Sequence, residues 1–367
     1  MAIVFYISGH GFGHASRDVE VINRLTHTNG SPIVIRSSVN PDLLRRTLTV
    51  PYDLRQGVCD TGVIQASSIT QDDPATVTAA LDFYRTFDER IEAEKQALDD
   101  IDVQLIVGDI PPLAFATATA LGVPSVALGN FTWDWIYETH PGFLPVGRHI
   151  VDLARECYRN VDLALELPFQ GGFEIFDRVE RLPLVARRAT QTRTATRAHF
   201  GLPADAPIAL LSFGGYGLPA LDLSAVDARG PWTIVTTDRV TAGQDQLPHV
   251  HVLAEARFRD SPFRYEDLVA AADVVVTKPG YGIISECITG DTALVYTARG
   301  AFREYDVLVL AMPPLLRSAY ISHADLFAGR WRELLEGVLA QPAPRERMET
   351  NGAEVAADII DAAERRP

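Results

Sequence analysis

The sequence has little of what marks a secreted, membrane-spanning or disulfide-rich protein. Only three of its 367 residues are cysteines, Cys59, Cys157 and Cys287, and they lie too far apart for a disulfide framework or a zinc site. No apolar run approaches the roughly 18–20 residues that cross a bilayer, and no basic segment precedes the first apolar run. We therefore expect no transmembrane segment, no signal peptide and a cytoplasmic location.

An excess of positive charge is also missing. The formal net charge is −15, whereas surfaces that bind nucleic acid are basic, so we expect no nucleic-acid partner. The composition, 47% hydrophobic and 22% charged, is typical of a soluble globular enzyme. The length suits two domains. An oligomer is compatible with the sequence, but nothing in it indicates one.

Short apolar runs alternate with helical stretches along the chain. Continuous apolar runs are typical of parallel strands that helices cover on both faces. The expected strands are 2–7, 32–37, 103–107, 124–128, 207–213, 232–236, 250–253, 273–277 and 293–296. The expected helices include 14–27, 75–98, 112–121, 265–271, 282–289, 331–340 and 351–364. This alternation predicts an α/β protein built from two doubly wound, Rossmann-like domains.

The strand–helix pattern restarts at 208–213, where a second apolar run is followed by a second glycine-rich turn. We place a hinge near 168–182. We therefore expect a first domain over residues 1–170 and a second over 171–344. The last segment, 345–367, contains a helix that we expect to pack back on the first domain.

The first strand leads into a glycine-rich loop, Gly9-His10-Gly11-Phe12-Gly13-His14. Alternate glycines require a tight turn and leave room for a ligand close to the backbone. Histidines exchange protons easily near neutral pH, so this loop favours an active site. The dinucleotide fingerprint does not fit, because the glycine spacing differs and the second strand ends without a carboxylate. Arg36 at that end leaves NADP as an alternative, and for His14 the alternative is a helix-start residue satisfied by its neighbours.

Asp109 follows the buried run 103–107 and precedes Pro111-Pro112. Ligands of open α/β sheets bind outside the carboxyl ends of the strands, where Asp109 and the first loop would both lie. Asp109 could therefore orient a histidine from that loop and stabilise its charge. The alternative is a cap for the following helix, a favoured position for aspartate.

Aromatic residues are concentrated in Asn130-Phe131-Thr132-Trp133-Asp134-Trp135-Ile136-Tyr137, directly after the expected strand 124–128. Aromatic faces suit the apolar faces of sugar rings and other organic ligands. The alternative is an aromatic patch packed at the domain interface.

In the second half, the run 273–277 leads into Lys278-Pro279-Gly280-Tyr281-Gly282 and then a helix that carries Glu286. The N–H groups and the positive end of such a helix would face a diphosphate. Glu286 would accept hydrogen bonds from a ribose diol. Arg303 and Glu304 follow the next strand at the same sheet edge. The alternatives are an ordinary turn and a solvated loop, and no cluster of histidine, cysteine or acidic residues has metal-ligand spacing.

Together these motifs resemble the GT-B glycosyltransferases. The loop that ends at His14 resembles the Gly-Gly-Thr-Gly-Gly-His loop of the bacterial peptidoglycan N-acetylglucosaminyltransferase family, with His14 on that family's histidine. The segment from Lys278 to Glu286 resembles that family's nucleotide motif, whose glutamate holds the ribose of UDP. Residues 303–306 stand where that family has a glutamine pair, so N-acetylglucosamine is not implied as the donor sugar.

The chain is also similar, over nearly its whole length, to the glycosyltransferase-like N-terminal region of the L-arabinokinase family. That region carries similar forms of residues 9–17, 109–112, 130–137, 212–217 and 351–354. The sugar-kinase half of that family is absent here, so the resemblance does not imply kinase activity.

The resemblance implies an inverting, metal-independent transferase without a cofactor, which moves a sugar from a nucleotide-diphosphate sugar such as a UDP-sugar to a small-molecule or glycan hydroxyl. The implied catalytic residues are His14, as general base, and Asp109, which orients it. The implied nucleotide and donor residues are Gly214, Gly215, Tyr216, Lys278, Gly280, Tyr281, Gly282, Glu286, Arg303 and Glu304. The implied acceptor residues are Gly11, Phe12, Gly13, Asn130, Trp133 and Trp135. Two alternatives are a non-hydrolysing nucleotide-sugar epimerase and a non-catalytic sugar-nucleotide-binding module.

Overall fold

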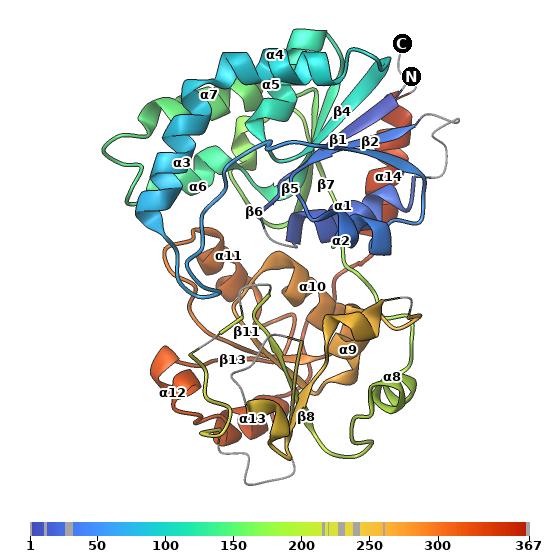
Figure 1. Cartoon of the computed structure of the whole chain (residues 1–367), viewed down its shortest axis with the longest axis vertical. Coiled ribbons are helices and arrows are strands. Elements are labelled where there is room, and N and C mark those ends of the chain that lie inside the picture. The colour runs from blue at the N-terminus through green and yellow to red at the C-terminus, as the bar shows by residue number, and fades with distance from the viewer. Residues whose placement is uncertain are drawn as a thin grey trace.

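The computed structural model shows two α/β units stacked along the long axis of the molecule (Figure 1). The structure describes residues 2–10, 13–25, 32–214, 217–218, 220–226, 232–237, 243–259 and 261–364. Four residues singled out from the sequence, Gly11, Phe12, Gly215 and Tyr216, lie outside the described residues.

The first unit contains a parallel seven-stranded sheet in the order β3-β2-β1-β4-β5-β6-β7. Its strands are β1 (Ala2–Ile7), β2 (Ile33–Ser37), β3 (Tyr52–Gln56), β4 (Val103–Asp109), β5 (Ser125–Phe131), β6 (Leu163–Gly171) and β7 (Val179–Arg181). β1 and β5 are buried along their whole length, as expected of apolar strands that are covered on both faces. The register pairs Ile7 of β1 with Asp109 of β4, so these two strands end at the same sheet edge.

Helices flank this sheet. They are α1 (Gly13–Ile22), α2 (Pro41–Thr47), α3 (Asp73–Arg85), α4 (Phe87–Ala97), α5 (Pro112–Leu121), α6 (Trp133–Thr139), α7 (Arg148–Arg159) and α14 (Gly352–Glu364). The single helix expected over 75–98 is broken at Thr86, which has φ −111° and ψ 29°. The Thr86 hydroxyl donates to the Phe83 carbonyl, a local hydrogen bond that competes with continuation of the helix.

The second unit contains a parallel six-stranded sheet in the order β10-β9-β8-β11-β12-β13. Its strands are β8 (Ile208–Ser212), β9 (Thr233–Thr236), β10 (Val250–Val252), β11 (Val274–Thr277), β12 (Ala293–Tyr296) and β13 (Ser318–Tyr320). Its helices are α8 (Arg193–Phe200), α9 (Tyr265–Ala271), α10 (Tyr281–Gly290), α11 (Glu304–Ala311), α12 (His323–Phe327) and α13 (Arg332–Leu339), and short 3-10 turns span Phe173–Ile175, Gln244–Gln246 and Glu255–Phe258.

Four strands of the structure, β3, β6, β7 and β13, were not expected from the sequence. β3, β7 and β13 are edge strands with partly exposed residues, so they lack the continuous apolar pattern. β6 contains Pro168 and ends at Gly171, residue types that indicate loops. Because β7 pairs with β6, the first sheet reaches Arg181, and the chain crosses to the second unit between Arg181 and α8.

Apolar contacts connect the first unit with distant parts of the chain. Ala353, Ala356 and Ile360 of α14 share a hydrophobic cluster with α1, and Tyr281 of the second unit belongs to the same cluster. Phe302 joins the other first-unit cluster. The three cysteines are free and buried. Within the described ranges, no helix is long and apolar enough to cross a membrane.

Candidate active site

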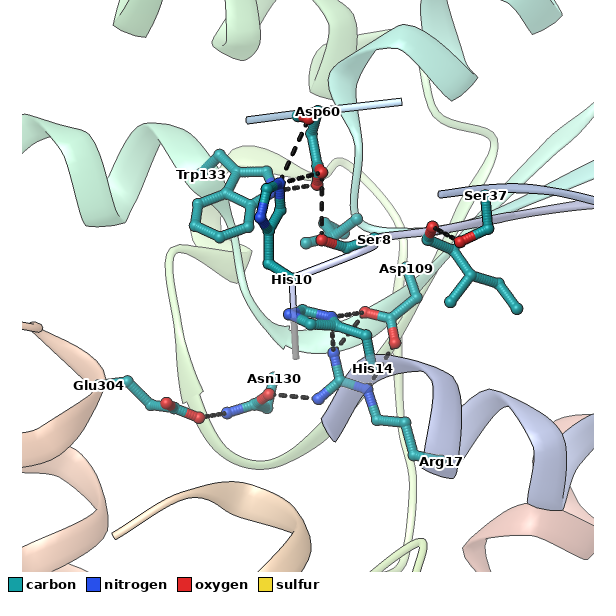
Figure 2. Close-up of polar contacts among 12 residues, drawn as sticks. Ser8, His10, His14, Arg17, Ser37, Asp60, Asp109, Asn130, Trp133 and Glu304 are labelled. Carbon is teal, nitrogen blue, oxygen red and sulfur yellow. Dashed lines mark hydrogen bonds and ion pairs between the residues drawn. The ribbon is translucent and has the colours of Figure 1, made fainter. Parts of the chain in front are cut away.

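His14 and Asp109 meet where β1 and β4 end. α1 begins at Gly13, so His14 lies in its first turn, and His14 Nδ1 is 2.9 Å from Asp109 Oδ1 (Figure 2). The Asp109 carboxylate only accepts hydrogen bonds, so it favours the tautomer with the hydrogen on His14 Nδ1 and the lone pair on Nε2. Arg17 Nη2 lies 3.1 Å from the same Nδ1 and only donates, so it favours the other tautomer. Burial would raise the pKa of Asp109, but the charges of Arg17 and His14 outweigh it and hold the pKa well below its usual range.

Arg17 completes this pair, although the sequence analysis gave it no role. Arg17 Nε donates to Asp109 Oδ2 at 2.6 Å, and its Nη2 contacts Oδ1 of the same carboxylate. Arg17 lies three residues after His14 on α1, and helix positions at this spacing share a face. The three-residue spacing from His14 is the feature of the sequence that could have placed Arg17 at this site. Both oxygens of Asp109 are therefore engaged and Asp109 is fixed as a carboxylate.

Asn130 connects this cluster to the second unit. Arg17 Nη1 donates to Asn130 Oδ1 at 2.5 Å, and Asn130 Nδ2 donates to Glu304 Oε1 at 2.8 Å. Asn130 is completely buried and Glu304 begins α11. A continuous polar chain thus runs from His14 to the second unit (Figure 2). The structure places Asn130 in this bridge between the units.

The two tryptophans expected to contact an acceptor are both engaged in packing. Trp133 is 2% exposed and stacks on Tyr137, with ring centroids 5.5 Å apart. The two residues are four apart on α6 and therefore share its buried face. Trp135 lies under Arg303, whose guanidinium is 4.4 Å from the ring centroid and whose Nη1 donates to the Trp135 carbonyl at 2.9 Å. Trp133 thus shows no free face to a ligand, and Trp135 holds the two units together.

The glycine turn of the second unit leaves space next to the start of α10. Gly280 is the N-cap of α10, and a Cβ on Gly282 or Gly214 would meet nothing within 4 Å. Gly214 has φ +74°, a conformation that favours glycine. The first N–H groups of a helix have no partner within it. The turn therefore offers room and backbone donors to an anionic group.

Lys278 and Arg299 flank this turn. Lys278 Nζ donates to Gln65 Oε1 of the first unit at 2.7 Å, and Arg299 Nη1 donates to the Pro279 carbonyl at 3.0 Å. Burial and, to a smaller extent, the charge of Arg299 together lower the pKa of Lys278 to about 7. Two cationic side chains thus lie close to the N-terminus of α10. Tyr281 points elsewhere, because its buried hydroxyl accepts from the Val185 N–H at 3.1 Å.

Glu286 is held by an arginine that the sequence analysis missed. Its Oε1 accepts from Arg187 Nε at 2.8 Å, whereas its Oε2 is buried without a partner among the described residues. Burial raises the pKa of Glu286 to about 6; Arg187 opposes this rise and Glu266 adds to it. One carboxylate oxygen on α10 therefore remains free to accept a hydrogen bond.

Two Rossmann-like units whose polar carboxyl edges meet define the GT-B fold, and the chain has this fold. Two curated relatives agree with it. L-arabinokinase of Arabidopsis thaliana is 27% identical over 367 residues, which cover 98% of this chain but 34% of that protein, so the chain spans about a third of that relative. An uncharacterized glycosyltransferase of Methanopyrus kandleri, MK0977, is 24% identical over 298 residues, covering 74% of this chain and 78% of that protein.

Solved structures show the same architecture. The calicheamicin glycosyltransferase CalG4 has a TM-score of 0.65 at 17% identity and covers 99% of this chain and 98% of its own. MurG of Acinetobacter baumannii has a TM-score of 0.52 at 12% identity, covering 99% of this chain and all of its own. No protein-family model matches the chain. These similarities confirm the resemblance and the fold expected from the sequence.

Proposed function

We propose that this protein is a glycosyltransferase that moves a sugar from a nucleotide-diphosphate sugar to an acceptor hydroxyl. The observation that carries the proposal is the His14–Asp109 pair, with 2.9 Å between its atoms, at the edge of the first sheet that meets the second unit. A carboxylate that fixes one imidazole nitrogen leaves the other as a general base. The glycosyltransferase relatives support the reaction class.

In this mechanism, His14 Nε2 takes the proton of the acceptor hydroxyl. The acceptor oxygen forms a bond to the anomeric carbon of the donor sugar, and the bond from that carbon to the diphosphate breaks. Its electron pair leaves with the diphosphate, and attack on the opposite face inverts the anomeric centre. The negative charge of Asp109 offsets the positive charge that His14 gains.

The second unit would hold the donor. The N-terminus of α10, together with Lys278 and Arg299, would bind the diphosphate and stabilise it as it leaves. The unpaired Oε2 of Glu286 would accept a hydrogen bond from a ribose hydroxyl once the groups that now bury this oxygen move aside. Glu304 would reach a donor sugar only by giving up a present contact, because Oε1 accepts from Asn130 and Oε2 accepts from Arg299 Nη1 at 3.3 Å.

The first test is a thermal-shift panel of nucleoside diphosphates and their sugars with the intact chain. A ligand that binds only the folded state stabilises it by about 2.7 kcal/mol at 100 times its dissociation constant, so UDP or a related nucleotide should raise the melting temperature. The stabilising donor is then incubated with and without monosaccharide and phenol acceptors, and the products are separated. L-arabinose belongs in the panel because of the name of the Arabidopsis relative.

The outcomes separate three functions. Glycosylated acceptor with release of the nucleoside diphosphate supports the proposal. An epimerised donor without any acceptor indicates an epimerase, and binding without turnover indicates a binding module. If no nucleotide stabilises the protein, the proposal is wrong.

A further inference from the structure

A second histidine–carboxylate pair lies beside His14 and has no role in the mechanism above. His10 Nε2 is 3.0 Å from Asp60 Oδ1 and 3.3 Å from the Asp60 carbonyl oxygen. The Asp60 side chain is 1% exposed, whereas 32% of the His10 side chain is exposed. A buried carboxylate therefore holds a histidine that reaches the surface of the first unit. Figure 2 shows this pair and the His14–Asp109 pair as two neighbouring groups of contacts.

Asp60 is itself fixed by two donors from separate elements. Ser8 Oγ donates to Asp60 Oδ1 at 3.1 Å, and Trp133 Nε1 donates to Asp60 Oδ2 at 2.8 Å. A carboxylate that accepts all these hydrogen bonds leaves the hydrogen on His10 Nε2. His10 Nδ1 is then the ring nitrogen left for another partner. Burial would lower the pKa of His10, but the charge and hydrogen bonds of Asp60 outweigh it and raise the pKa, so this nitrogen readily gains a proton and becomes a donor.

The packing around His10 leaves its ring little freedom. A Cβ on Gly62, which has φ +55°, would lie 2.4 Å from the His10 ring. On another side, the rings of His10 and Trp133 meet edge to face, with centroids 6.4 Å apart. The centroid of the Trp133 ring is also 6.3 Å from the centroid of the His14 ring. One buried indole thus lies against both histidines.

We propose that His10 is an acceptor-binding residue, whose Nδ1 hydrogen-bonds a second oxygen of the acceptor while His14 deprotonates the attacking hydroxyl. The inference rests on the proposed function. The features proposed above to bind the nucleotide lie on the second unit, which leaves the first unit, where both histidines lie, for the acceptor. A molecule held by two imidazoles of this kind carries a hydroxyl for His14 and a second oxygen that accepts from His10 Nδ1. A polyhydroxylated molecule such as a monosaccharide meets both requirements, and this is the acceptor class that the inference names.

The matched test is His10→Gln. The Gln amide can still donate to Asp60, so a purely structural role of His10 would be preserved, whereas the second ring nitrogen is lost. The imidazole proton signals of the wild type are recorded by NMR in saturating UDP, and the His10 signal is assigned by its loss in the variant. Six common monosaccharides, with L-arabinose among them, are then titrated into both proteins.

We expect at least one monosaccharide to shift the His10 signal and to bind His10→Gln at least tenfold more weakly, with the dissociation constant of UDP unchanged. If UDP binds but no monosaccharide shifts the His10 signal, or if His10→Gln binds the sugar as the wild type does, the inference is overturned and the proposed function stands. If neither UDP nor any other nucleoside diphosphate binds the wild type, the proposed function fails and the inference fails with it.

Discussion

We expect Lys278 to make the affinity for the proposed donor diphosphate depend on pH. Its ammonium lies beside Arg299 in a largely buried position, and its pKa is lowered to about 7. The protonated fraction of Lys278 therefore falls from about one half at pH 7 to about one tenth at pH 8 and about one hundredth at pH 9. A bound diphosphate favours the charged form, so binding at pH 9 requires proton uptake. The dissociation constant of UDP should accordingly rise between pH 7 and pH 9, by up to about 50-fold in the limit in which only the charged form of Lys278 binds.

The assay is isothermal titration calorimetry with UDP from pH 7 to pH 9, a range above the phosphate ionisation near pH 6. Two buffers with different ionisation enthalpies report the proton uptake directly. Lys278→Arg is the matched control, because arginine stays charged throughout this range and its affinity should hardly change with pH. A wild-type affinity that is constant from pH 7 to pH 9, or one that declines equally in Lys278→Arg, would refute the reasoning.

Three further predictions concern the clusters around His14 and His10. Asn130→Ala removes one hydrogen bond from each of the charged groups of Arg17 and Glu304, and hydrogen bonds to charged groups contribute about 1.5–3 kcal/mol each, so urea denaturation should show a loss of at least about 2 kcal/mol. A loss below about 0.5 kcal/mol would contradict the bridge. The pKa of Asp109 is lower in the folded protein than the unfolded value of about 3.9, so the Asp109 carboxylate stabilises the folded state fully above about pH 3.9 and progressively less as the pH falls below it. The free energy of unfolding, measured between pH 5 and pH 2, should therefore fall less steeply with acid in Asp109→Asn than in the wild type. Trp133→Phe removes a donor from buried Asp60 and should destabilise by about 1–3 kcal/mol, and unchanged stability would show that this hydrogen bond is unimportant.

The meeting of His14 and Asp109 could be predicted from the sequence. Asp109 ends one buried strand and His14 follows another, and the carboxyl ends of parallel strands share one edge of a sheet. The role of Arg17 was harder to predict, because the residue that an arginine reaches depends on how α1 is rotated against the sheet. The sequence could not decide the role of Trp133 either, because aromatic residues give the same pattern whether they line a binding face or pack in the interior. The stacking of Trp133 on Tyr137 in the structure identifies it as a packed residue.

Edge strands and the connection between the units were the least predictable parts of the fold. The partly exposed strand β7 carries polar residues, so its place in the first sheet depends on pairing with β6, a contact between segments distant in the chain. The engagement of Glu286 by Arg187 also joins residues that lie far apart in sequence. Local periodicity carries no information about such pairs.

The most direct test of the central claim compares the turnover of His14→Gln with that of the wild type, with the donor and acceptor that the panel identifies. A general base contributes about 10²–10⁴-fold, so kcat should fall by at least about 100-fold while the dissociation constant of UDP stays the same. His149→Gln, the same substitution at an exposed histidine of α7, is the control and should retain wild-type turnover. If kcat of His14→Gln stays within about tenfold of the wild type, His14 is not the catalytic base and the account is contradicted.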